Sequence, residues 1–174
     1  MRLKIDLNGI MLKLKIKGYR PSVRDGWDCQ WCNVDFSFSS GKWLNYYRED
    51  DEVLLACEVE NLTQSIDKLL CDELSEQTEI SCIEPDFKFI LYPKKDLRKD
   101  PKYTYIRKGF EFEDVHMEWR VSFWDDGLTD NYLSVSLNRE TMNILLVYLK
   151  YVTGEFKIDD PEVVKLMQRD FLIE

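Results

Sequence analysis

The sequence predicts an α+β protein, with a mainly antiparallel, strongly twisted β-sheet, two main helices packed on one face and an extra C-terminal helix. Three observations lead to this fold class. Most segments alternate apolar and polar residues, which is the period of a half-buried strand. Two longer segments repeat apolar residues at steps of three and four, which is the period of a helix. Strands and helices do not alternate one by one, so hairpins rather than parallel units are expected.

The N-terminal segment has the pattern of a β-hairpin. Apolar residues alternate with polar ones from Leu3 to Leu7 and again from Ile10 to Ile16. Asn8-Gly9 lies between these runs, and both residues tolerate the positive φ of a two-residue type I′ turn. A turn of that length places the apolar residues of both runs on one face of the hairpin.

The remaining strands show the same alternation, and turn residues separate them. We expect further strands at Cys32–Phe38, Trp43–Tyr47, Ile80–Ile83, Phe87–Leu91, Tyr103–Phe112, Val115–Phe123 and Leu133–Leu137. Connections are expected at Gly18–Gly26, at the charged link Glu49–Glu52, at the exposed loop Lys94–Lys102 and at the turn Asp125–Gly127.

Three helices follow from the period of 3.6 residues. The first runs from about Glu58 to near Leu74, and the preceding Val53–Cys57 fits either a short strand or a first helical turn. The second begins after Asn138, a good N-cap, and ends at Gly154. The last begins at Asp160-Pro161 and extends to about Phe171.

The length and composition indicate one domain. A chain of 174 residues is typical of a single domain, and 44% apolar with 13% aromatic residues is enough to form a core. We expect residues 1–154 to form the α+β core and residues 155–174 to form a helical extension.

The charge restricts the class of partner. The chain carries a net charge of −9, and its pI is about 4.8. An acidic surface repels phosphate, so nucleic acid and anionic membranes are poor partners, whereas a basic protein is favoured. Solubility alone is the other explanation of such a charge.

The cysteines are expected to be free thiols in the cytoplasm. The chain contains an odd number of them, Cys29, Cys32, Cys57, Cys71 and Cys82. Met1–Lys17 has no apolar core of a signal peptide, and the longest apolar run, Ile144–Leu149, is far shorter than a membrane span. Cys29 and Cys32 form a C-x-x-C motif, but its flanks resemble a strand and no second ligand pair accompanies it, so ordinary packed cysteines are expected.

The sequence contains no catalytic motif that we can identify. There is no phosphate-binding glycine loop and no H-E-x-x-H, and His116 is the only histidine. A group of acids, Glu111, Glu113, Asp114, Glu118, Asp125 and Asp126, could hold Mg²⁺ in a hydrolase, but without a fixed ligand spacing a solvated face or a recognition patch is favoured. We therefore expect neither an enzyme nor a metal or other cofactor.

A loop with two tryptophans provides an alternative site. Trp27 and Trp31 flank a charged turn and could stack a sugar, a base or another small ligand. The same side chains could equally cover the end of the sheet core.

Several motifs resemble those of the WapI-type immunity proteins. Residues 26–34, GWDCQWCNV, are similar to a W-D-x-x-W-x-N-V pattern near the start of these proteins. The helix opening at Cys57 and ending in Leu69-Leu70, and the segment Ile83–Phe89 with its Glu-Pro-Asp, resemble later parts of the family. The chain departs from the family in having Cys32 where leucine is frequent and Cys57 where threonine or aspartate is frequent, and residues 155–174 lie outside the resemblance.

The resemblance implies a bacterial cytosolic protein that neutralises the toxic C-terminal domain of a secreted polymorphic toxin. Such toxic domains are often basic nucleases, so an acidic inhibitor suits the task by opposite charge. Charge clustering in the sequence then predicts the contact residues, which are Glu49, Asp50, Asp51, Glu52, Glu111, Glu113, Asp125 and Asp126. A small-ligand module using Trp27 and Trp31, and a metal-dependent hydrolase, are the alternative functions.

Overall fold

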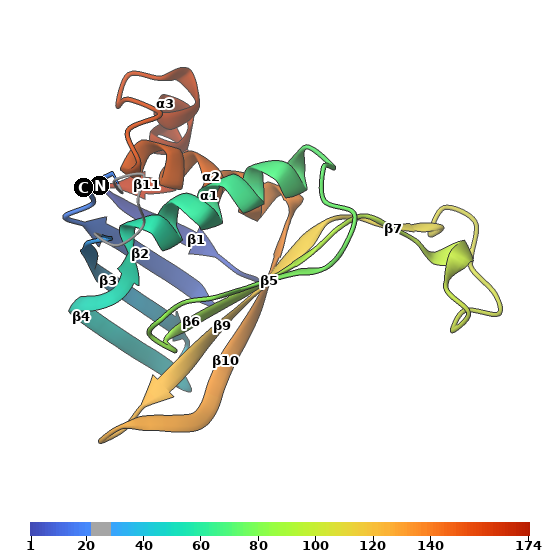
Figure 1. Ribbon diagram of the computed structural model, residues 1–174, viewed down its shortest axis with the longest axis horizontal. Helices are drawn as coiled ribbons and strands as arrows, with labels where there is room; N and C mark the ends of the chain where they lie inside the picture. Colours follow the sequence, from blue (N-terminus) through green and yellow to red (C-terminus); the bar gives the residue numbers. More distant parts are fainter. Residues whose placement is uncertain (22–28) are drawn as a thin grey trace.

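The computed structural model, which describes residues 1–21 and 29–174, has two larger antiparallel sheets and three helices (Figure 1). This arrangement confirms the predicted α+β class, although the strands are divided between two sheets. The five-stranded sheet has the order β11-β1-β2-β3-β4. Its strands are β1 (Arg2–Asp6), β2 (Met11–Lys17), β3 (Trp31–Ser40), β4 (Leu44–Leu55) and β11 (Leu172–Ile173).

The second sheet has four strands in the order β10-β9-β6-β5, and a separate pair is formed by β7 and β8. The strands of the second sheet are β5 (Thr78–Ser81), β6 (Phe87–Tyr92), β9 (His116–Trp124) and β10 (Leu128–Asn138). The short pair consists of β7 (Lys95–Asp96) and β8 (Phe112–Glu113), with a 3₁₀ turn at Leu97–Lys99. The helices are α1 (Ala56–Leu70), α2 (Arg139–Val152) and α3 (Pro161–Gln168).

The first hairpin has the predicted register. Leu3 pairs with Leu14 and Ile5 with Leu12, and all four side chains are buried. The turn between them has φ values of 55° at Asn8 and 92° at Gly9, as a type I′ turn requires.

The core lies where the two sheets face each other beneath the helices. Phe36 of β3 contacts Phe87 of β6 at 4.8 Å between ring centroids, and Phe38 contacts Trp119 of β9 at 5.7 Å. These edge-to-face contacts join the two sheets. Helix α2 is joined to the five-stranded sheet by a buried hydrogen bond, in which the Ile16 N–H donates to Tyr148 Oη at 2.8 Å.

One predicted connection and one predicted strand take a different form in the structure. The charged link Glu49–Glu52 is part of the twelve-residue β4, because a β-bulge opposite Asp35 accommodates Glu49 and Asp50 within an edge strand. The predicted strand Tyr103–Phe112 is wrong except at its last residue, since the chain there forms turns with no sheet beside it. Alternation alone cannot identify a strand that lacks a pairing partner.

Helix α1 is shorter than predicted and ends at Leu70 rather than near Leu74. Cys71 is the C-cap, and Asp72 takes a left-handed conformation with φ of 58°. The Glu73 N–H then donates to the Lys68 carbonyl at 2.9 Å, which closes the helix end.

The prediction that all cysteines are free is wrong for two of them. Cys29 forms a disulfide with Cys57, across 28 residues and with a Cα–Cα distance of 6.0 Å. The bond joins the entry of β3 to the first turn of α1, so the partner of Cys29 comes from a distant segment and not from the C-x-x-C motif. Cys32, Cys71 and Cys82 are free.

The C-terminal extension is part of the fold. Val163 and Leu166 of α3 and Leu172 of β11 are buried. Strand β11 pairs with the outer edge of β1, and the Lys4 N–H donates to the Phe171 carbonyl at 2.8 Å. Helix α3 therefore ends at Gln168, before the predicted Phe171, because the chain must turn back to pair with β1.

Candidate protein-binding site

Six of the eight predicted contact acids lie on two neighbouring segments of the body. These six, Glu49, Asp50, Asp51, Glu52, Asp125 and Asp126, are called the acid end below. The guanidinium of Arg48 in β4 lies 5.6 Å from the Trp124 ring at the end of β9, and Tyr46 Oη donates to the Ser122 carbonyl. These contacts bring the acidic part of β4 beside the β9–β10 turn that carries Asp125 and Asp126.

The β-bulge in β4 fixes one acid of the acid end. Asp50 adopts a φ of 55°, and its carboxylate accepts hydrogen bonds from Lys17 Nζ at 2.8 Å and Asn33 Nδ2 at 3.0 Å. Its own N–H donates to Asp35 Oδ1 at 2.8 Å. The hydrogen bond from Lys17 lowers the pKa of the Asp50 carboxyl. Asp50 is therefore engaged in the fold, which reduces its capacity to meet a partner.

The next acid is also paired, whereas the others are open to solvent. Asp51 forms an ion pair with Arg48. Glu49 and Glu52 are exposed and form no ion pair with a described residue, and the same holds for Asp125 and Asp126. These four carboxylates are the ones that the acid end leaves exposed and without an ion pair to a described residue.

The aspartate of the Glu-Pro-Asp motif, Asp86, lies inside the fold. Asp86 is buried at the entry of β6, and Arg48 of the other sheet lies 4.0 Å from its carboxylate. Burial raises the pKa of this carboxyl, and the nearby guanidinium of Arg48 opposes that rise. Asp86 thus contributes to the junction of the two sheets rather than to an open surface.

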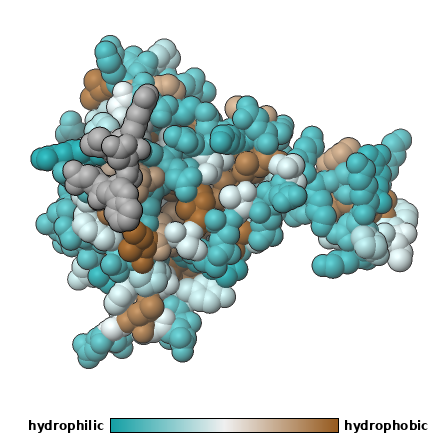
Figure 2. Space-filling view, viewed as in Figure 1, coloured by the Kyte–Doolittle hydropathy of each residue, from teal (hydrophilic) through white to brown (hydrophobic). Residues whose placement is uncertain are grey.

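The other two predicted acids, Glu111 and Glu113, lie on a projection that extends away from the body. Residues 94–113, called the arm below, extend from the body as a lobe with β7 at its base (Figure 1), and Figure 2 shows this lobe projecting from one side of the body. Glu111 and Glu113 belong to this arm and not to the acid end. The arm was not predicted as a unit from the sequence.

The charge of the arm is opposite to that of the chain. Residues 94–113 contain seven lysines and arginines and four aspartates and glutamates, which gives a net charge of +3. Since the whole chain carries −9, the remaining residues together carry −12. This change of composition between Pro93 and Asp114 was visible in the sequence and could have identified the arm.

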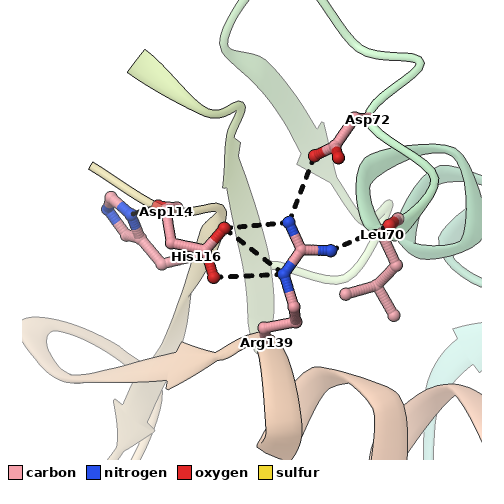
Figure 3. A network of polar contacts seen from close by, with 5 residues as sticks. All are labelled: Leu70, Asp72, Asp114, His116 and Arg139. Atoms are coloured by element: carbon pink, nitrogen blue, oxygen red, sulfur yellow. Dashed lines mark hydrogen bonds and ion pairs between the residues drawn. The ribbon is translucent and has the colours of Figure 1, made fainter. Parts of the chain in front are cut away.

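A polar network fixes the base of the arm to the helices (Figure 3). Arg139, the first residue of α2, donates to both carboxylate oxygens of Asp114, at 2.8 Å from Nη2 and 3.1 Å from Nε. It also donates to the Leu70 carbonyl at 2.9 Å and to Asp72 at 3.1 Å. These bonds lower the pKa of the Asp114 carboxyl and raise the pKa of Arg139. One guanidinium therefore joins the end of α1, the start of α2 and the end of the arm.

The single histidine lies beside this network on the four-stranded sheet. The His116 ring is stacked on Tyr92 at 4.5 Å between centroids, and its Nδ1 is 3.4 Å from the Asp114 carbonyl. His116, Tyr92 and Glu113 line a surface hollow of about 490 Å³ together with Lys94 and Lys95 at the base of the arm.

Strand β9 holds its one carboxylate in an ion pair. Glu118 accepts hydrogen bonds from Arg120 Nε at 2.9 Å, from Tyr92 Oη at 3.2 Å and from the Ser134 hydroxyl. The bond from Arg120, followed by that from Ser134, lowers the pKa of Glu118 to about 2. Within residues 1–21 and 29–174, no three His, Cys, Asp or Glu side chains are grouped in a way that could hold a metal ion.

Of the two tryptophans of the alternative site, the structure describes Trp31. Trp27 lies outside the described residues. Trp31 is the first residue of β3, where it pairs with Leu55 and is half-buried.

A comparison with known protein families identifies the family of this chain. The model of the WapI-like immunity protein family matches residues 2–157. The chain belongs to this family, which confirms the resemblance found in its motifs and indicates a toxin-neutralising role. No curated protein matched the chain. In the described part of the chain, no helix has the length and apolarity that crossing a membrane requires.

Proposed function

We propose that this chain is a non-enzymatic immunity protein that binds the toxic C-terminal domain of a secreted bacterial polymorphic toxin and covers its active site. Membership of the WapI-like immunity family is the observation that carries this proposal. The partner is a protein, and the place of action is the cytoplasm, where an incoming toxic domain would meet its target.

The charge supports a basic toxic domain, such as a nuclease. A body of −12 attracts a basic surface over roughly a Debye length, about 8 Å at physiological salt. Opposite potentials of this kind raise the association rate more than they raise the final affinity. The open acids of the acid end, Glu49, Glu52, Asp125 and Asp126, are the proposed source of this attraction on one side of the body.

Co-expression tests the function directly. The C-terminal domain of the toxin encoded beside this gene is expressed from an inducible promoter, with or without this chain. We expect growth arrest by the domain alone, rescue by the chain, and a stable complex of the two on a sizing column. Growth arrest that this chain does not relieve, with both proteins present at equal levels, would exclude the proposed function.

Charge reversal tests the proposed role of the acid end. The fourfold variant Glu49→Lys, Glu52→Lys, Asp125→Lys and Asp126→Lys should bind the toxic domain more slowly, with a weaker dependence of the association rate on salt. A matched control reverses four exposed acids elsewhere on the body, which are Glu155, Asp159, Glu162 and Glu174. Equal association rates for both variants and the wild type, measured at low salt, would show that the acid end does not steer binding.

A further inference from the structure

The arm exposes a large aromatic surface to solvent. Four aromatic residues of the arm are at least half exposed, which are Tyr103 at 50%, Tyr105 at 82%, Phe110 at 62% and Phe112 at 53%. None of the twenty residues of the arm is buried. Leaving such rings in water forgoes the stabilisation of burial, and exposed apolar groups concentrated in one element mark interaction sites.

The arm is nevertheless held in a defined shape by its own polar contacts. The Leu97 N–H donates to the Glu111 carbonyl at 2.9 Å, and Glu111 accepts a bond from the Gly109 N–H at 2.8 Å. Asp96 pairs with Arg98 at 2.8 Å, and the guanidinium of Arg98 lies 4.9 Å from the Phe112 ring. A projection organised in this way loses less conformational entropy on binding than a free loop would lose.

The composition of the arm is that of a protein-binding hot spot. Tyrosine and arginine are enriched among the residues that contribute most of the energy of protein interfaces, and the arm places two of each beside two phenylalanines. A projecting element with such residues fits a concave partner surface better than a flat one.

The charges form a pattern with two zones. The outer part of the arm is cationic, with Arg98, Lys99, Lys102, Arg107 and Lys108 exposed. The base carries four acids: Asp72 and Asp114 are paired with Arg139, and Glu76 and Glu113 line the hollow at the base beside Lys94 and Lys95. The complementary partner is a cleft with carboxylates and apolar surface inside and a basic rim outside.

We infer that the arm, residues 94–113, is the element that enters the active-site cleft of the toxic domain, with its cations toward the carboxylates of the cleft and the acids of its base toward the basic rim. This inference rests on the proposed function. A metal-dependent nuclease has such a cleft, because its rim must attract phosphate while carboxylates inside hold the catalytic metal ions. The arm occupies the space of the substrate.

The test measures the affinity of the purified toxic domain for arm variants. Tyr105→Ser combined with Phe110→Ser removes two exposed rings without touching the core. We expect the dissociation constant to rise about a hundredfold or more, as the loss of two hot-spot side chains implies. The matched control is Ile83→Ser combined with Ile158→Ser, which removes two apolar side chains that are 70% and 56% exposed on the body, and it should stay within about threefold of the wild type.

The outcomes separate the inference from the function on which it rests. No binding by the wild type would exclude the proposed function itself. Wild-type binding that the arm variant retains in full would overturn the role of the arm and leave the function standing. Thermal unfolding of the arm variant should match the wild type, which excludes misfolding as the cause of a loss.

A second measurement tests whether the arm binds nucleic acid instead of the toxic domain. A fluorescent single-stranded oligonucleotide is titrated with the chain alone at physiological salt. We expect no saturable binding, because the body of −12 repels phosphate. Saturable binding that the change Arg107→Glu with Lys108→Glu abolishes, while affinity for the toxic domain is unchanged, would assign the arm to nucleic acid and overturn the inference.

Discussion

Tyr148 provides the buried polar link between α2 and the five-stranded sheet, and replacing it by phenylalanine has a calculable effect. The residue has no exposed surface, and its hydroxyl accepts a hydrogen bond from the Ile16 N–H at 2.8 Å. Burial raises the pKa of this phenol, so it stays neutral at all usual pH values. Tyr148→Phe preserves the ring but removes the hydroxyl acceptor of this buried N–H, and the loss of such a buried hydrogen bond costs about 1–3 kcal/mol.

Urea unfolding of Tyr148→Phe measures this cost. We expect the midpoint to fall at an unchanged slope, and a loss of about 2 kcal/mol should lower the Tm by about 4–8 °C in a chain of this size. Tyr151→Phe is the matched control, since Tyr151 is half-buried and its hydroxyl bonds to no described residue, so the change should stay within about 0.5 kcal/mol. A Tyr148→Phe variant as stable as this control would show that the hydroxyl does not link the helix to the sheet.

Three further predictions concern stability. The folded pKa of Glu118, about 2, lies below its ordinary value of 4.5, so its ion pair stabilises the fold above about pH 4.5 and this contribution disappears as the pH falls toward 2. In Glu118→Gln, the free energy of unfolding should therefore fall less between pH 4.5 and pH 2 than in the wild type, by up to about 2 kcal/mol. The same dependence on pH in both proteins would contradict this. The double change Cys29→Ser with Cys57→Ser opens a loop of 28 residues and should cost about 3–4 kcal/mol without reductant, while the denatured wild type should titrate as three thiols rather than five. Leu172→Ala, at a residue 3% exposed, should cost about 2–4 kcal/mol in urea unfolding, and a neutral result would show that β11 is dispensable.

The sequence was sufficient where the local pattern and the tertiary environment agree. The first hairpin follows from alternation and from Asn8-Gly9, and the start of α2 follows from Asn138, whose side chain accepts the Thr141 N–H at 3.0 Å. In both places the residues that form the element also supply its turn or cap, so no distant partner is needed.

The features that the sequence did not reveal depend on distant partners. Strand β11 has two residues and exists because it pairs with β1, from the opposite end of the chain. The disulfide partner of Cys29 is likewise set by the approach of β3 to α1. The division into two sheets depends on the contacts of Phe36 and Phe38 with the other sheet, which no local pattern encodes.

The candidate site was predicted in part for a similar reason. Charge clustering along the chain found the acids, but it could not show that Asp50 and Asp51 are paired within the fold while Glu49 and Glu52 remain open. It also grouped Glu111 with the other acids, although that residue lies on a cationic arm. Net charge per segment, rather than clusters of one sign, would have separated the two surfaces.

An inhibition titration tests the central claim most directly. The toxic domain is assayed on its own substrate at a concentration well above the dissociation constant, while this chain is added in steps. The account predicts a linear loss of activity that reaches zero at one chain per toxic domain, and a complex that no longer binds substrate. A saturated complex that keeps its activity, or one that still binds substrate, would contradict occlusion of the active site.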